Sequence, residues 1–137
     1  MLTSHMRIAR PVTNLELSRE MYCSGLGMRV LGSFTGHNGF NGVMLGAQGL
    51  PWHFEFTVCE QHPVPPAPTP EDLLVLYLPD EARWRRSCQR LGEAGFERVV
   101  SFNPYWDVAG KTFQDHDGYR LVLQNRAWGD ESGAGAA

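Results

Sequence analysis

The stretch WHFEFTV, residues 52–58, alternates apolar and polar side chains at every position. A period of two residues is typical of a β-strand whose two faces meet different environments. The apolar face consists of Trp52, Phe54, Phe56 and Val58. Burial of this face against helices is favourable by roughly 25 cal/mol per Å² of apolar surface, whereas the opposite orientation would bury an anionic glutamate. We therefore expect His53, Glu55 and Thr57 to point away from the helices.

The residues that precede this strand predict a first module, residues 7–59, with the order strand, helix, strand, strand, strand. The expected elements are a strand at 7–12, a helix at 13–27, and strands at 28–34, 42–47 and 52–58. Thr13 or Asn14 can cap the start of the helix, because their side chains accept from free backbone N–H groups. Gly25 or Gly27 can end it, because glycine adopts the left-handed conformation without strain.

The second half of the chain repeats this order after a proline-rich segment. Residues 60–71 contain five prolines, which cannot continue a helix or a strand ladder, so we expect a linker. The second module, residues 72–126, is expected to contain strands at 73–79, 96–102, 111–115 and 119–125. Its helix is expected to open at Pro79 and Asp80 and to close at Gly95. We also expect a loop at 103–110 and a tight turn at 116–118, with Gly118 at positive φ.

The two ends of the chain are expected to lie outside the modules. Residues 1–6 read as leader or expression-derived sequence, so we give His5 little weight as a functional residue. Residues 127–137 are small and polar and predict a disordered tail.

Composition narrows the classes of partner. A net charge of -3 and a pI near 5.9 provide no broad attraction for nucleic acid or anionic membranes. No run approaches the roughly 18 apolar residues of a membrane span. The three cysteines have no C-x-x-C spacing, which fits reduced thiols in a cytoplasm. We expect a cytoplasmic protein with neither nucleic-acid nor membrane partners.

Two phrases resemble a known superfamily. VTNLELSREMYCSGLGMRVL, residues 12–31, and GKTFQDHDGYRLVLQN, residues 110–125, are similar to sequences of the vicinal oxygen chelate superfamily, which includes glyoxalase I, extradiol dioxygenases and the fosfomycin and bleomycin resistance proteins. TFQDHDG resembles the usual F-x-D-P-D-G, with His116 where proline is common. The resemblance implies an α+β fold in which two βαβββ modules form a curved, barrel-like sheet with helices on the convex side and a ligand pocket in the concavity. It also implies a homodimer.

Metal-dependent members of this superfamily hold one divalent ion with residues from the first and last strands of each module. The resemblance places these positions at Arg7, Glu55, Leu74 and Val122. Only the glutamate can ligate an ion, because a guanidinium has no lone pair to donate and aliphatic side chains have no donor atom. We therefore expect no metal and no other cofactor.

A displaced divalent-metal site is the alternative. His53 and Glu55 point the same way along their strand and could hold an ion if a loop supplied a third ligand. The candidates for that ligand are His37, His62 and His116.

A cavity-facing Glu55 without a metal needs a cationic or hydrogen-bonding partner. Arg7, at the position of the first metal ligand, is the expected partner, and the pair could be purely structural or could also bind an anionic ligand. His53 titrates near neutrality when unperturbed, so it fits either proton transfer or a hydrogen-bonded polar network.

Further ligand contacts are expected in the second module. Asn103, Tyr105 and Trp106 lie in a polar loop, where the aromatic rings could form a wall against a flat ligand or pack against a neighbouring module. Arg120 and Gln124 alternate on the last strand and are expected to point into the cavity.

These features favour a metal-independent protein that sequesters a small organic molecule in an aromatic-walled cavity, in the manner of the bleomycin resistance proteins. The alternative is a lyase, an isomerase or a dioxygenase-like enzyme in which Glu55 and His53 act as acid and base, with or without a displaced divalent metal. A scaffold or dimerising module with a filled cavity is a third possibility, because a fold does not fix a function.

Overall fold

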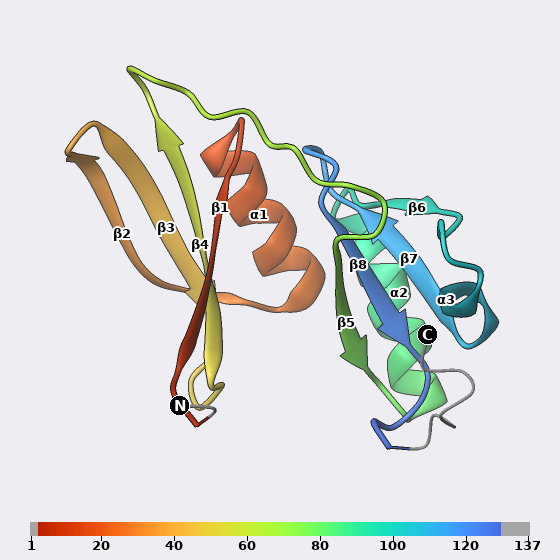
Figure 1. Ribbon diagram of the computed structural model, residues 1–137. Coiled ribbons are helices and arrows are strands. Elements are labelled where there is room, and N and C mark those ends of the chain that lie inside the picture. The colour runs from red at the N-terminus through yellow and green to blue at the C-terminus, as the bar shows by residue number, and fades with distance from the viewer. Residues whose placement is uncertain (1–2, 130–137) are drawn as a thin grey trace. The chain divides into compact units, whose positions relative to one another are not determined.

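The computed structural model describes residues 3–129 (Figure 1). The chain divides into two compact units, Met1–Ala67 and Pro68–Ala137, and each is described by itself. The boundary lies within the proline-rich segment, where residues 60–71 contain no helix or strand. Of the expected terminal segments, residues 1–2 and 130–137 lie outside the described residues. No helix of the described chain is long and apolar enough to cross a membrane.

The first unit has the predicted order of elements. These are β1 (Met6–Pro11), α1 (Leu15–Leu26), β2 (Arg29–His37), β3 (Phe40–Gly46) and β4 (Trp52–Cys59). The strands form one sheet in the order β1-β4-β3-β2, in which β1 is parallel to β4 and the other neighbours are antiparallel. Helix α1 packs against one face of this sheet, as Figure 1 shows.

Helix α1 begins and ends at residues that the sequence offered as caps. Asn14 Oδ1 accepts a hydrogen bond of 3.0 Å from the backbone N–H of Leu17. Gly27 ends the helix in the left-handed conformation, at φ 70°. This φ explains the glycine, because a side chain at that φ would be strained.

The packing of α1 fixes the orientation of β4. The ring of Tyr22, on α1, meets the rings of Phe54 and Phe56 edge-on at 5.5 and 4.9 Å between centroids. Phe54 and Phe56 are 1% and 0% exposed. The prediction that the aromatic face of β4 packs against a helix is therefore confirmed, and His53 and Glu55 lie on the other face.

The second unit repeats the βαβββ order. Its elements are β5 (Leu73–Tyr77), α2 (Glu81–Glu93), β6 (Glu97–Val99), α3 (Tyr105–Val108), β7 (Gly110–Gln114) and β8 (Arg120–Gln124). The sheet order is β5-β8-β7-β6, with β5 parallel to β8 and the remaining pairs antiparallel. The two βαβββ modules predicted from the sequence are thus both present.

Helix α2 is anchored at its start and along its length. Asp80 Oδ2 accepts 2.8 Å from the backbone N–H of Arg83, as an N-cap. Trp84 Nε1 donates 2.8 Å to the carbonyl oxygen of Leu123, which ties the helix to β8. At the far end, Gly95 has φ 100°, in agreement with the expected stop.

Two predictions for the second unit are wrong in detail. Strand β6 covers three residues and not the seven of 96–102, because Ser101 N–H donates to the Asp107 carboxylate at 3.1 Å and so leaves the ladder. The expected loop at 103–110 contains the short helix α3, and Asn103 Oδ1 accepts 3.1 Å from Tyr105 N–H in the turn that leads into this helix. An asparagine two residues before a turn favours this local bond.

Candidate functional site

The sheet of the first unit presents a polar group of side chains on the face opposite α1. The parallel register places Arg7 of β1 directly beside His53 of β4. Glu55 lies two residues further along β4 and therefore on the same face. Strand pairing thus brings Arg7 next to His53 and Glu55, which lie 46 and 48 positions further along the sequence.

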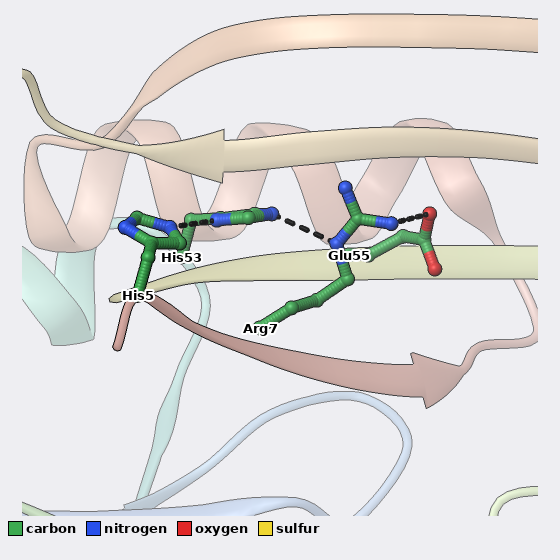
Figure 2. Close-up of polar contacts among 4 residues, drawn as sticks. All are labelled: His5, Arg7, His53 and Glu55. Carbon is green, nitrogen blue, oxygen red and sulfur yellow. Dashed lines mark hydrogen bonds and ion pairs between the residues drawn. The ribbon is translucent and has the colours of Figure 1, made fainter. Parts of the chain in front are cut away.

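Figure 2 shows these side chains joined in a chain of hydrogen bonds. Arg7 Nη1 donates 3.0 Å to Glu55 Oε2, so the predicted ion pair is confirmed. Arg7 Nε donates 2.9 Å to His53 Nε2. His53 Nδ1 lies 2.6 Å from Nε2 of His5.

The chemistry of arginine fixes the direction of this chain. A guanidinium can only donate, so His53 Nε2 must be the acceptor and the proton of His53 must lie on Nδ1. His53 Nδ1–H then donates to His5 Nε2. Both ring nitrogens of a neutral His53 are therefore engaged.

His5 is a site residue that the sequence analysis missed. We gave it little weight because residues 1–6 read as leader sequence, whereas the structure places it in contact with His53. The available signal was its spacing, since His5 and Arg7 follow the period of two that β1 continues.

The surroundings of His53 favour its neutral form. Partial burial, followed by the charges of Arg7 and His5, lowers the pKa of His53 below its usual value, and Glu55 opposes this shift. A second proton on His53 would occupy Nε2, break the bond from Arg7 and set two cations side by side. The network therefore requires a neutral histidine.

Arg7 is the most accessible charged group of this network. Its side chain is 48% exposed, whereas that of Glu55 is 16% exposed. Nη2 of Arg7 has no hydrogen-bond partner among residues 3–129. Glu55 and His53 hold the guanidinium in place, and its free edge can meet an acceptor atom from solution.

The strand register of the second unit corrects one expected metal position. Leu74 pairs with Leu121, while Val122 pairs with Val75. Paired residues share a face, so Leu74 and Val122 lie on opposite faces of the sheet, and the prediction that both face one site is wrong. Leu73 and Val75 share the face of Val122, and they are aliphatic too.

The residues at these positions do not fit a divalent ion. Leu73, Leu74, Val75 and Val122 of the second unit have no donor atom. In the first unit the guanidinium of Arg7 is paired with the carboxylate of Glu55. A displaced site has no support in the described chain, because residues 3–129 contain no group of three or more His, Cys, Asp or Glu side chains that could hold an ion. His53 Nε2 is also engaged by Arg7.

Arg120 and Gln124 occupy the face of β8 that carries Val122. Arg120 Nε donates 3.0 Å to Gln114 Oε1 on β7. Gln124 is 0% exposed, and neither atom of its amide has a hydrogen-bond partner among the described residues. Gly110 lies opposite Gln124, and a Cβ at Gly110 would clash with Gln124 Oε1. A buried amide without a partner is unusual and marks a place for a polar atom.

The aromatic residues of the second unit lie in α3. The rings of Tyr105 and Trp106 meet edge-on at 4.9 Å, and both residues are half-buried. The carbonyl oxygen of Trp106 lies beside Gly110, so α3 and Gln124 flank the same glycine. The side chain of Asn103 bonds to the backbone at the start of α3. Two of the predicted ligand contacts of this unit, Trp106 of α3 and Gln124, thus lie close to each other.

Comparison with known proteins agrees with this architecture. Residues 6–57 match the YycE-like N-terminal domain and residues 71–125 the YycE-like C-terminal domain. The chain is 38% identical over 122 residues to the uncharacterized protein YycE of Bacillus subtilis (strain 168), which covers 89% of this chain and 88% of that protein. This chain belongs to the YycE-like family.

Solved structures give the wider relationship. A crystal structure of YycE from Bacillus subtilis superimposes with a TM-score of 0.85 at 37% identity and covers 96% of this chain and 94% of that one. The fosfomycin resistance protein FosX from Mesorhizobium loti has a TM-score of 0.68 at 11% identity, over 90% and 92% of the chains. TnmS3, an antibiotic binding protein from Streptomyces sp. CB03234, has a TM-score of 0.62 at 23% identity, and the match covers 90% of this chain and 97% of that one. The YycE-like fold is that of the vicinal oxygen chelate superfamily.

Proposed function

We propose that this YycE-like protein binds a small organic molecule without a metal ion, and that Arg7 recognises an acceptor oxygen of that molecule. The observation that carries the proposal is the accessible guanidinium, which Glu55 and His53 hold from two sides. An arginine that is already oriented loses less side-chain freedom when it binds an oxygen. Carboxylates, phenolates and polarised carbonyl groups are the matching ligand chemistry.

The second unit has proposed ligand contacts of its own. Neither amide atom of Gln124 has a partner within residues 3–129, and both would find one in a polar ligand or a bound water. Arg120, Asn103 and the rings of Tyr105 and Trp106 remain proposed ligand contacts. TnmS3 is an antibiotic binding protein, so this scaffold can hold an organic molecule. A cytoplasmic homodimer is the proposed setting.

Catalysis by Glu55 and His53 is the second candidate. It rests on the lowered pKa of His53, which leaves a neutral imidazole near pH 7. Sequestration is favoured over it because both imidazole nitrogens and one carboxylate oxygen are already engaged. A general base would first have to break one of these bonds.

Ligand-induced stabilisation tests the proposal. The protein, treated with a chelator, is screened by thermal denaturation against aromatic and quinone-like compounds with and without a carboxylate. A ligand at 100 times its Kd stabilises the native state by about 2.7 kcal/mol and raises Tm. We expect acceptor-bearing compounds to raise Tm, Arg7→Ala to abolish the shift, and Arg29→Ala, which removes an exposed arginine of β2, to preserve it.

Three outcomes separate the candidates. A shift that appears only after addition of a divalent ion would reject the metal-independent proposal. Conversion of the hit compound that disappears in His53→Asn would favour the enzyme. A panel without any shift in Tm would favour a scaffold with a filled cavity.

A further inference from the structure

The second unit has a cleft on the α2 side of its sheet, away from the face that carries Gln124. Lys111 marks this side, because its Nζ lies 5.2 Å from the centre of the Trp84 ring of α2. The cleft has a volume of about 320 Å³. Its lining residues are Arg85, Cys88 and Gln89 of α2, Arg98 of β6, and Lys111 and Phe113 of β7.

The charges around this cleft are unbalanced. Three elements each contribute a cation, and no carboxylate is among the lining residues. Arg85 has a long ion pair, 3.6 Å, with the exposed Glu81. Arg98 and Lys111 form no ion pair with any residue of 3–129. Cations that converge on one cleft repel one another unless an anion lies between them. Such a cluster stands out in a chain whose net charge is -3.

Trp84 holds two of these cations in place. The guanidinium of Arg85 and the ammonium of Lys111 lie 5.9 and 5.2 Å from the centre of its ring. The indole is itself tied to β8 by the bond from Nε1 to the Leu123 carbonyl oxygen. The cations are thus positioned by cation–π contacts, which leave their N–H donors available.

The thiol of Cys88 lies within the electrostatic influence of all three cations. Burial raises the pKa of its thiol, and the charges of Lys111, Arg98 and Arg85 oppose that rise. All three cations therefore act on one sulfur atom. The thiol stays protonated near neutral pH, so it adds no negative charge to the lining.

We propose that this cleft binds the phosphate group of a small phosphorylated molecule. Two guanidinium groups and one ammonium group provide the donors that a tetrahedral dianion accepts, and arginine matches phosphate oxygens in pairs. The volume suits a phosphate with a small organic substituent. This site is separate from Arg7 and does not depend on the function proposed for the first unit.

Calorimetric titration of the intact protein tests the proposal with phenyl phosphate and inorganic phosphate, against phenol and sodium chloride at equal ionic strength. We expect both phosphates to bind and both controls to give no heat. Arg98→Ala should weaken phosphate binding about tenfold or more, the usual effect of a lost charge-assisted bond. Arg86→Ala removes the same charge from an exposed position of α2 that does not line the cleft, and should leave the affinity within about twofold.

The relative affinities identify the source of the phosphate. Tighter binding of phenyl phosphate supports a phosphorylated organic molecule, and equal affinities support free phosphate at the same site. Absence of binding, equal losses in Arg98→Ala and Arg86→Ala, or full competition by chloride would overturn the proposal.

Thiol labelling gives an independent readout at the same place. Phenyl phosphate should slow the alkylation of Cys88 by iodoacetamide at least about twofold, because a ligand that fills the cleft covers the sulfur. Cys23 and Cys59 serve as internal references, since both lie in the first unit. Equal slowing of all three thiols would count against a site at Cys88.

Discussion

At the scale of single residues, the Arg7–Glu55 pair can be measured by a double-mutant cycle. Arg7→Leu leaves Glu55 without its cation and should lower the free energy of unfolding. A fully buried pair would lose about 3–5 kcal/mol, but Arg7 is 48% exposed, so water replaces part of the lost contact and we expect about 1–2 kcal/mol. Urea denaturation measures the change.

The second mutation distinguishes a specific pair from general damage. Glu55→Gln should restore part of the loss in the Arg7→Leu background, because the amide no longer requires a cation. Strictly additive effects would show that the two side chains do not interact. Arg29→Leu, at an exposed position of β2, controls for the removal of one positive charge.

His53 makes the stability of the protein depend on pH. Its pKa in the folded protein lies below the usual 6.5, so the unfolded chain takes up a proton at a higher pH than the native state does. Stability should therefore be complete above pH 6.5 and should fall as pH decreases from 6.5 towards the lower, native pKa. Urea midpoints between pH 5 and 8 should show this slope, and His53→Gln should flatten it.

Two controls accompany this prediction. His62→Gln, in the exposed proline-rich segment, corrects for the removal of one histidine. An NMR titration of the His53 ring reports its native pKa directly. A pKa of 6.5 or above in this NMR titration would contradict the prediction, because the hydrogen bond from Arg7 to Nε2 requires a neutral His53.

At the scale of elements, hydrophobic periodicity predicted which face of a strand is buried. Alternation in β4 assigned Phe54 and Phe56 to the helix and Glu55 to the opposite face, because burial of the charge would be costly. The pairing of Arg7 with Glu55 could also be predicted, since both belong to the same face of neighbouring strands.

The errors arose where local hydrogen bonds override periodicity. Strand β6 ends early because the Asp107 carboxylate binds the backbone N–H of Ser101, and the turn into α3 is held by the bond from Tyr105 N–H to Asn103 Oδ1. Neither bond leaves a periodic signal. The assignment of Leu74 failed for a different reason: the register of β5 against β8 is a pairing over long sequence distance, and a shift of one residue reverses the face.

At the scale of the whole molecule, each unit has a core of its own. Phe56 packs against Tyr22 and Phe54, all within residues 6–59, whereas Leu121 and Leu123 belong to the sheet that α2 covers. The cores were predicted as two modules because each half of the sequence contains its own helix and its own apolar strands. A loss of packing in one core should therefore be felt first in its own unit.

Hydrogen exchange can test this independence. Phe56→Ala creates a cavity at a residue that is 0% exposed and should destabilise the first unit by about 3–5 kcal/mol. Amides of β1–β4 should then exchange faster, while those of β5–β8 keep their rates, because local unfolding follows contiguous cooperative units. Leu121→Ala should give the reciprocal pattern. Equal acceleration in both sheets after either mutation would mean that the two βαβββ modules unfold as one cooperative body.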